Sequence, residues 1–118
     1  MAQKYIVGDI VMYKNRIHTI IDILASNGYE LSYVRHPVSP VRLPGVPLTP
    51  EILEKNGWKS INGKYALKIK NANYVVLEFT EDGIYVYINE KTILFTIKYI
   101  HELQHFLFGL GLNSEMEV

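Results

Sequence analysis

The sequence predicts an α+β fold that is mostly antiparallel β, with an SH3-like N-terminal lobe, one short capped helix and a C-terminal helix packed on a β-meander. Short alternating runs of apolar and polar residues, separated by Gly, Asn and Asp, predict the strands. All five prolines fall within residues 37–50 and divide the two strand-rich segments. After residue 98 the apolar period changes to that of a helix. A chain of 118 residues is expected to form a single domain.

Residues 1–36 are predicted to form a β-rich N-terminal lobe. Its strands are expected at residues 9–13, 16–24 and 29–34. The turns between them are expected at Lys14-Asn15 and Ser26-Asn27-Gly28, because Asn and Gly tolerate the positive φ of tight hairpins. A small antiparallel meander of this kind resembles the SH3-like modules of the KOW and Tudor types.

Residues 37–50 read as a proline-rich connector between two strand-rich segments. Proline fixes φ and disfavours helix in the residue before it, so the stretch is predicted to be extended and stiff. PxxP spacing is also typical of a ligand for an aromatic groove, but a connector is the more common role for such a segment.

The connector leads into a short helix at residues 49–57. Thr49 is a favourable N-cap and Pro50 suits the first helical position. Gly57 suits the left-handed position after the helix, which would place Trp58 against Leu53. The tryptophan is therefore predicted to close the helix rather than to form an exposed binding site.

Residues 58–98 are predicted to form a β-meander. Strands are expected at residues 65–70, 74–80, 84–89 and 92–97, and turns at residues 62–63, 71–73, 81–83 and 90–91. In the third strand, alternation places Tyr85 and Tyr87 on the face opposite its isoleucine and valine side chains. The tyrosine face is either a second packed layer or a contact surface. Tyr85 and Tyr87 are the candidate contact residues, because tyrosine-rich strand faces suit contact surfaces.

A C-terminal helix is expected at residues 98–111, followed by a tail at residues 112–118. The helical period gathers an apolar stripe of Tyr99, Ile100, Leu103, Phe106, Leu107 and Leu110. The same period places Lys98, His101, Glu102 and His105 on the opposite, outward face. The apolar stripe is predicted to hold the helix on the sheet.

The outward face contains a five-residue match to H-E-x-x-H, the signature of zinc metallopeptidases. In that alternative, His101 and His105 bind zinc and Glu102 is the general base. A catalytic zinc needs a third protein ligand, however, and the positions that would continue a metzincin motif are Phe108 and Gly111. We therefore predict a coincidental match, with no catalytic residues, no metal ligands and no cofactor.

Composition limits the function classes further. The formal net charge is zero, so general attraction to nucleic acid or to anionic lipid is not expected. The absence of cysteine excludes disulfides and thiolate chemistry. No secretion signal is visible, and no apolar run reaches the roughly 20 residues that span a bilayer. The expected location is therefore the cytoplasm, without membrane attachment.

Two blocks, PLTPEILEKNGW at residues 47–58 and YIHELQHFLFGLG at residues 99–111, resemble a group of small uncharacterised proteins encoded by bacteriophages and prophages of gut anaerobes. The resemblance extends from about Pro47 to the C-terminus, and GDIVMY resembles the variable β-rich start of that group. In the group the position of His105 need not be histidine, which favours a structural helix. The resemblance implies no activity, cofactor or catalytic residue.

These observations predict a non-catalytic, small binding or accessory protein of phage or prophage origin that acts through a protein partner or through self-association. The minimal zinc metallopeptidase is the first alternative. A nucleic-acid-binding SH3-like module is another, carried by Lys14, Arg16, Arg35 and Arg42. An inhibitor of host defence is compatible with the same sequence. The sequence identifies no small-molecule ligand.

Overall fold

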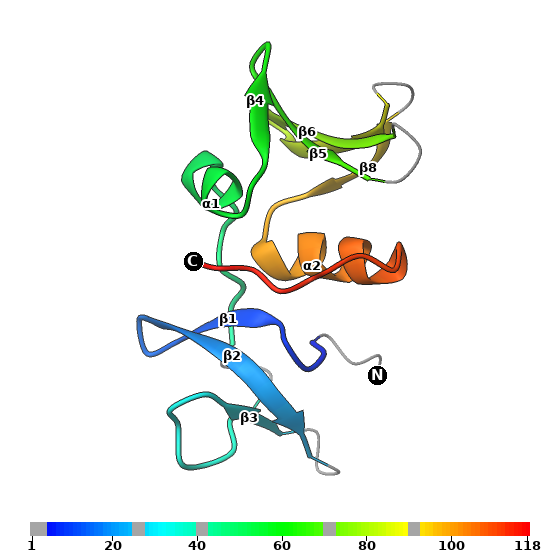
Figure 1. Ribbon diagram of the computed structural model, residues 1–118. Helices are drawn as coiled ribbons and strands as arrows, with labels where there is room; N and C mark the ends of the chain where they lie inside the picture. Colours follow the sequence, from blue (N-terminus) through cyan, green and yellow to red (C-terminus); the bar gives the residue numbers. More distant parts are fainter. Residues whose placement is uncertain (1–4, 25–27, 40–42, 70–72, 90–92) are drawn as a thin grey trace. The chain divides into compact units, whose positions relative to one another are not determined.

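A computed structural model describes residues 5–24, 28–39, 43–69, 73–89 and 93–118, and the chain divides into two compact units (Figure 1). The first unit comprises Met1–Pro47 and Tyr99–Met116. The second unit comprises Leu48–Lys98 and Glu117–Val118. Each unit therefore combines segments that lie far apart in the sequence.

The first unit contains a small antiparallel sheet and the C-terminal helix. In its described part, β1 (Ile10–Tyr13), β2 (Arg16–Ile23) and β3 (Tyr29–Leu31) pair in the order β1-β2-β3, and α2 (Ile100–Gly109) contacts β1. The predicted class is confirmed: the fold is α+β, mostly antiparallel, and its C-terminal helix packs on a sheet. The prediction named the meander as that sheet, whereas α2 belongs to the unit of β1–β3. The SH3-like topology stays a prediction.

Turn chemistry explains the lengths of these strands. Lys14 and Asn15 both have positive φ, at 49° and 63°, as a tight hairpin between β1 and β2 requires. Tyr33 also has positive φ, at 61°, so the chain leaves the sheet after β3, earlier than the predicted strand end at residue 34. The predicted turn residues Ser26 and Asn27 lie outside the described residues.

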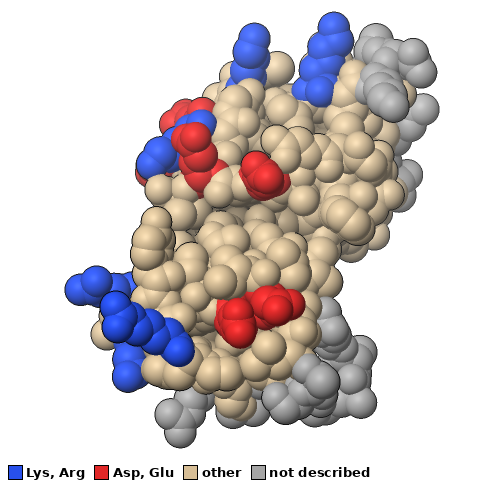
Figure 2. Space-filling view, turned by 60° about the horizontal axis from the view of Figure 1, so that its bottom comes forward, with Lys and Arg blue, Asp and Glu red and all other residues tan. Residues whose placement is uncertain are grey.

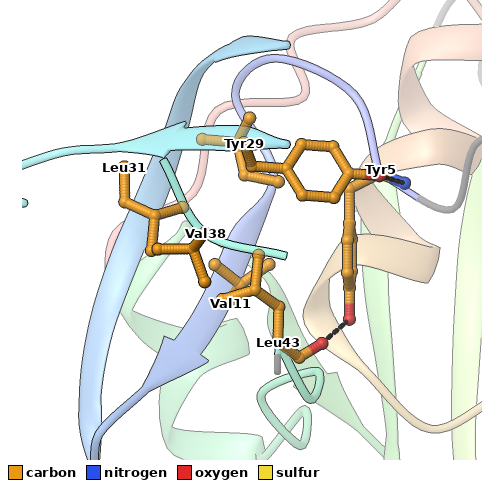
Figure 3. Packing of buried hydrophobic residues seen from close by; sticks show 7 residues of the cluster. Tyr5, Val11, Tyr29, Leu31, Val38 and Leu43 are labelled. Atoms are coloured by element: carbon orange, nitrogen blue, oxygen red, sulfur yellow. Dashed lines mark hydrogen bonds between the residues drawn. The ribbon is translucent and has the colours of Figure 1, made fainter. Parts of the chain in front are cut away.

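An apolar cluster fills the inner face of this sheet (Figure 3). Its buried members are Tyr5, Val11, Ile20, Tyr29, Leu31, Val38 and Leu43. The rings of Tyr5 and Tyr29 meet edge to face with centroids 5.7 Å apart, and the Tyr29 hydroxyl accepts the Tyr5 N–H at 3.2 Å. Burial of these side chains is the main stabilising contribution in the unit.

The second unit contains one short helix and the meander. They are α1 (Pro50–Lys55), β4 (Lys59–Ile61), β5 (Lys64–Lys68), β6 (Tyr74–Thr80), β7 (Gly83–Ile88) and β8 (Ile93–Ile97). The strands pair antiparallel in chain order, from β4 at one edge to β8 at the other. Strand β4 was not predicted separately, although its turn at Asn62-Gly63 was. The predicted turns at residues 71–73 and 90–91 lie wholly or largely outside the described residues.

Register explains why one face of this sheet is core. Val75 pairs with Leu67 and Ile88, while Leu77 pairs with Tyr65 and Val86, and directly opposite residues share a face. Val75, Leu77 and Val86 are fully buried. The opposite face carries Tyr85 and Tyr87, as the alternation predicted.

Helix α1 has the predicted caps. The Thr49 side chain accepts the Ile52 N–H at 3.4 Å, and Pro50 is the first helical residue. Gly57 has a φ of 86°, and the Trp58 N–H donates to the Leu53 carbonyl at 3.0 Å. Trp58 and Leu53 are both buried, so the tryptophan closes the helix.

The connector forms isolated bridges rather than a helix. Within the first unit, Gly45 bridges Val11, and the Ile100 N–H donates to the Val46 carbonyl at 2.8 Å. Residues 40–42 of the predicted connector lie outside the described residues.

The end of the tail is held in the second unit by the side chain of Asn56. Its amide nitrogen donates to the Glu117 carbonyl at 2.8 Å, and its amide oxygen accepts the Glu117 N–H at 2.8 Å. Among the described residues, no helix has the length and apolar character needed to cross a bilayer.

Candidate functional site

The HELQH motif lies on α2, and its polar residues are turned partly inward. His101 and Gln104 are buried, with 6% and 3% of their surface exposed. Tyr99 and Leu110, predicted in the buried stripe, are 38% and 43% exposed. The prediction that His101 faces outward is therefore wrong. Polar main-chain and carboxylate groups at the start of β1 need partners, and the polar side of α2 supplies them.

Gln104 forms the closest link between α2 and the start of β1. Its side-chain oxygen accepts the Ile10 N–H at 2.9 Å. Its amide nitrogen donates to the carbonyl of Gly8 at 2.9 Å and to that of Ser114 at 3.0 Å. One buried amide thus satisfies groups from the sheet and from the tail after the helix.

His105 forms the second link. Its Nε2 lies 2.6 Å from Oδ2 of Asp9, a carboxylate that is 1% exposed. The same oxygen accepts the Ile6 N–H at 2.9 Å. Burial raises the pKa of Asp9 above its ordinary value, although the Ile6 N–H and His105 lower it in part. The buried carboxylate and the half-exposed imidazole therefore form a pair that holds α2 to the turn before β1.

His101 lies within a group of aromatic rings. Its ring meets that of Tyr5 edge to face at 4.8 Å and stacks on that of Tyr99 at 5.7 Å. Burial, with Tyr29, Asp9 and Tyr99 nearby, raises the pKa of Tyr5 to about 12. The Tyr5 hydroxyl therefore stays protonated and donates to the Leu43 carbonyl. His101 therefore contributes to the packing of the unit through its contacts with the two tyrosine rings.

The central glutamate of the motif has a local role. Glu102 Oε1 accepts the Tyr99 N–H at 3.0 Å, the backward bond of a capping box at the start of α2. Among the described residues, no group of three or more His, Cys, Asp or Glu side chains is placed to hold a metal ion. The two motif histidines do lie together, with ring centroids 5.8 Å apart. The zinc alternative stays an untested hypothesis.

The raised pKa of Asp9 predicts a pH dependence of stability. Between its ordinary value of 3.8 and its higher native pKa, the native carboxyl binds more protons than the unfolded one, so its contribution to stability falls as pH rises. Chemical denaturation of the wild type and of Asp9→Asn across the acidic range measures this effect. We expect the wild type to lose stability relative to the variant as pH rises. The prediction would be contradicted if the difference in unfolding free energy between the two proteins stayed constant with pH. It would also be contradicted if that difference grew in favour of the wild type as pH rises.

The predicted contact residues Tyr85 and Tyr87 lie on one face of β7 and are half-buried. The Tyr87 hydroxyl donates to Glu78 Oε1 at 2.6 Å, and the Tyr85 hydroxyl lies 3.4 Å from Asp82 Oδ2. Register places Thr96 beside Tyr85 and Ile93 beside Tyr87. The tyrosine face therefore continues onto β8.

Strand β8 carries the most exposed apolar surface of the described meander strands. Ile93, Leu94 and Phe95 are all exposed, Leu94 to 50%. In the described part of the chain, β8 pairs with β7 alone, so its other side is an edge of the sheet. None of its five residues is charged. The sequence predicted this strand but not its place at the edge.

The basic residues of the nucleic-acid alternative lie in the first unit. Lys14 and Arg16 are exposed at the turn between β1 and β2, and Arg42 lies outside the described residues. Arg35 is exposed and directly precedes His36, whose ring centroid lies 6.2 Å from that of Tyr13. Tyr13 lies opposite Arg16 in the register, and Lys14 Nζ is 5.5 Å from its ring centroid.

Comparison of the chain with protein families, with curated proteins and with solved structures gave no match.

Proposed function

We propose that this protein is a non-catalytic binding protein of phage or prophage origin, acting in the bacterial cytoplasm through protein–protein contacts. The contact is self-association, in which β8 of one copy pairs antiparallel with β8 of a second copy. The observation that carries this proposal is the exposed, uncharged β8 at the edge of the five-stranded sheet.

Unprotected edge strands pair readily with other strands, and soluble proteins usually protect them with charge or with very short strands. The two edges of this sheet differ in this respect. Strand β4 has three residues, and one of them, Lys59, is charged. Strand β8 has five residues without charge, and its register with β7 is irregular near Leu94. The edge at β8 is thus the one suited to accept a further strand.

A second copy is the occupant that the charge pattern favours. Isologous pairing places the same strand on both sides of a two-fold axis, so any charge on β8 would face its own copy. An uncharged strand avoids that repulsion. The tyrosine face beside β8 supplies Tyr85 and Tyr87, side chains that are common at protein interfaces.

Light scattering coupled to size exclusion tests the proposal. The wild type is expected to form a dimer whose population rises with concentration. Leu94→Lys introduces a charge on each side of the axis, and we expect it to weaken association at least about tenfold. Tyr85→Ala is expected to weaken it less, because Tyr85 lies beside the paired edge.

The matched control is Ile61→Lys, the same kind of change at an exposed apolar position on β4. It is expected to leave association unchanged. A wild type that is monomeric at every concentration, or a dimer that Leu94→Lys leaves intact, would overturn the proposal. A monomer that binds only an unrelated protein would show that the occupant is not a second copy.

A further inference from the structure

The charges of the first unit are separated along its sheet, although the formal net charge of the chain is zero. Lys14, Arg16 and Arg35 are exposed near the turn between β1 and β2. Asp22 and Glu30 lie directly opposite each other toward the other end of β2. In the lower part of Figure 2, blue side chains gather at the left and red ones lie nearer the middle. A net charge of zero for the whole chain is therefore compatible with a local basic surface on the first unit.

The loop that follows β3 is fixed against this surface at both of its ends. At its start, the Ser32 carbonyl lies 2.7 Å from Nδ1 of His18, and the Ser32 hydroxyl accepts the Thr19 N–H at 3.0 Å. At its end, the His36 ring lies 6.2 Å from that of Tyr13. Because both ends are held near β1 and β2, the intervening residues 33–35 lie at the same end of the sheet as the basic turn.

Tyr33 is the most exposed aromatic residue of this loop. Its side chain is fully exposed, and its φ of 61° is a conformation that aromatic residues rarely adopt. The loop therefore holds a tyrosine ring in solvent, two residues before the exposed Arg35 in the chain. Burial cannot explain its conformation, since the ring contributes nothing to the core.

We propose that this basic–aromatic end of the first unit binds single-stranded nucleic acid. We define the surface by Tyr13, Lys14, Arg16, Tyr33 and Arg35. Tyr33 stacks on a base, and the three cations contact consecutive phosphates. The rings of His18 and His36 both meet that of Tyr13 edge to face, with ring centroids 6.1 and 6.2 Å from its own.

The aromatic component favours nucleic acid over an acidic peptide. Carboxylates would satisfy the cations, but they give no role to an exposed ring held at positive φ. Single strands need both features, because the phosphates require positive charge and the unpaired bases require flat rings. The surface is small, so a short site of a few nucleotides is expected.

Fluorescence anisotropy with labelled oligo-dT and oligo-U at low salt tests the proposal on the full chain. Both probes are expected to bind. Tyr33→Ala is expected to weaken binding about 5- to 100-fold, the effect of losing one base–aromatic stack. Tyr33→Phe keeps the ring and is expected to bind as the wild type does. Arg35→Gln is expected to reduce the slope of log affinity against log salt by about 0.7.

The matched control is Lys59→Gln on β4, which removes an exposed cation from the second unit and is expected to change nothing. Absence of binding at low salt would overturn the proposal. Binding that Arg35→Gln weakens but Tyr33→Ala does not would show charge attraction without stacking and would overturn it too. Equal competition by an Asp- and Glu-rich peptide would assign the surface to acidic peptides instead. Because Tyr33 is exposed and far from β8 in the sequence, these results are independent of the self-association test.

Discussion

Replacement of Gly45 by alanine is expected to destabilise the first unit by about 1–3 kcal/mol, the usual cost of overpacking a filled interior. A Cβ at this position would lie 2.8 Å from Cε1 of His101 and 2.8 Å from Cγ of Tyr99. The His101 ring cannot move away easily, because it is buried between the rings of Tyr5 and Tyr99. Hydrogen is therefore the only side chain that this close approach of connector and helix accommodates.

Gly109→Ala is the matched control, since it makes the same change at the end of α2. Nothing lies within 4 Å of the position that its Cβ would take. Alanine favours helix over glycine, so this variant is expected to be unchanged or up to about 1 kcal/mol more stable. Urea denaturation of both variants gives the comparison. Equal effects at the two positions would contradict the packing account of Gly45.

Replacement of Gln104 by leucine is expected to cost about 2–4 kcal/mol of unfolding free energy, although it adds an apolar side chain to a buried site. The substitution removes the acceptor of the Ile10 N–H and the donor to the Gly8 carbonyl. A buried polar group without a partner costs about 1–3 kcal/mol, and the loss here affects more than one group. The tail after α2 loses its bond at Ser114 in the same variant.

Asn113→Leu is the control for Gln104→Leu, because it makes a similar amide-to-apolar change at an exposed residue. Its side chain is exposed and accepts the nearby Glu115 N–H at 3.1 Å, so an effect within about 0.5 kcal/mol is expected. Hydrogen exchange of the Ile10 amide provides a second readout. If Gln104→Leu leaves both stability and this exchange rate unchanged, the amide does not link α2 to β1 in the way described.

Local signals in the sequence were sufficient to predict helix α1. Its N-cap, first-turn proline, left-handed glycine and closing tryptophan all lie within residues 49–58, and each forms the predicted contact. The hairpin turns at Lys14-Asn15 and Asn62-Gly63 were predictable for the same reason, because positive φ depends mainly on the residues of the turn.

The orientation of α2 could not be predicted in this way. The helical period located the helix correctly. It assigns every polar side chain opposite the apolar stripe to the exposed face, however, including a buried imidazole such as that of His101. Gln104 bonds Ile10, which lies 94 residues earlier in the sequence, and His105 bonds Asp9, which lies 96 residues earlier. No local pattern carries information about such partners. Nor did any local pattern single out Gly45, because its neighbours His101 and Tyr99 also lie far from it in the chain.

The candidate surfaces were predictable in composition but not in placement. Tyr85 and Tyr87 were assigned to one face from alternation alone, and the register confirms that they share it. That β8 forms an edge depends on the pairing order of the sheet, and that Tyr33 is exposed depends on where β3 ends. Both are properties of the assembled fold.

The division of the chain also sets an order of events during synthesis. The described strands of the second unit lie before residue 98, so its sheet does not depend on α2. The first unit, although it begins at the N-terminus, must wait for α2 before Ile10 and Asp9 find their partners. The amino-terminal strands therefore leave the ribosome first and complete their unit only after α2 has followed. A chain that stops at residue 98 would leave the Ile10 N–H and the Asp9 carboxyl without their partners on α2.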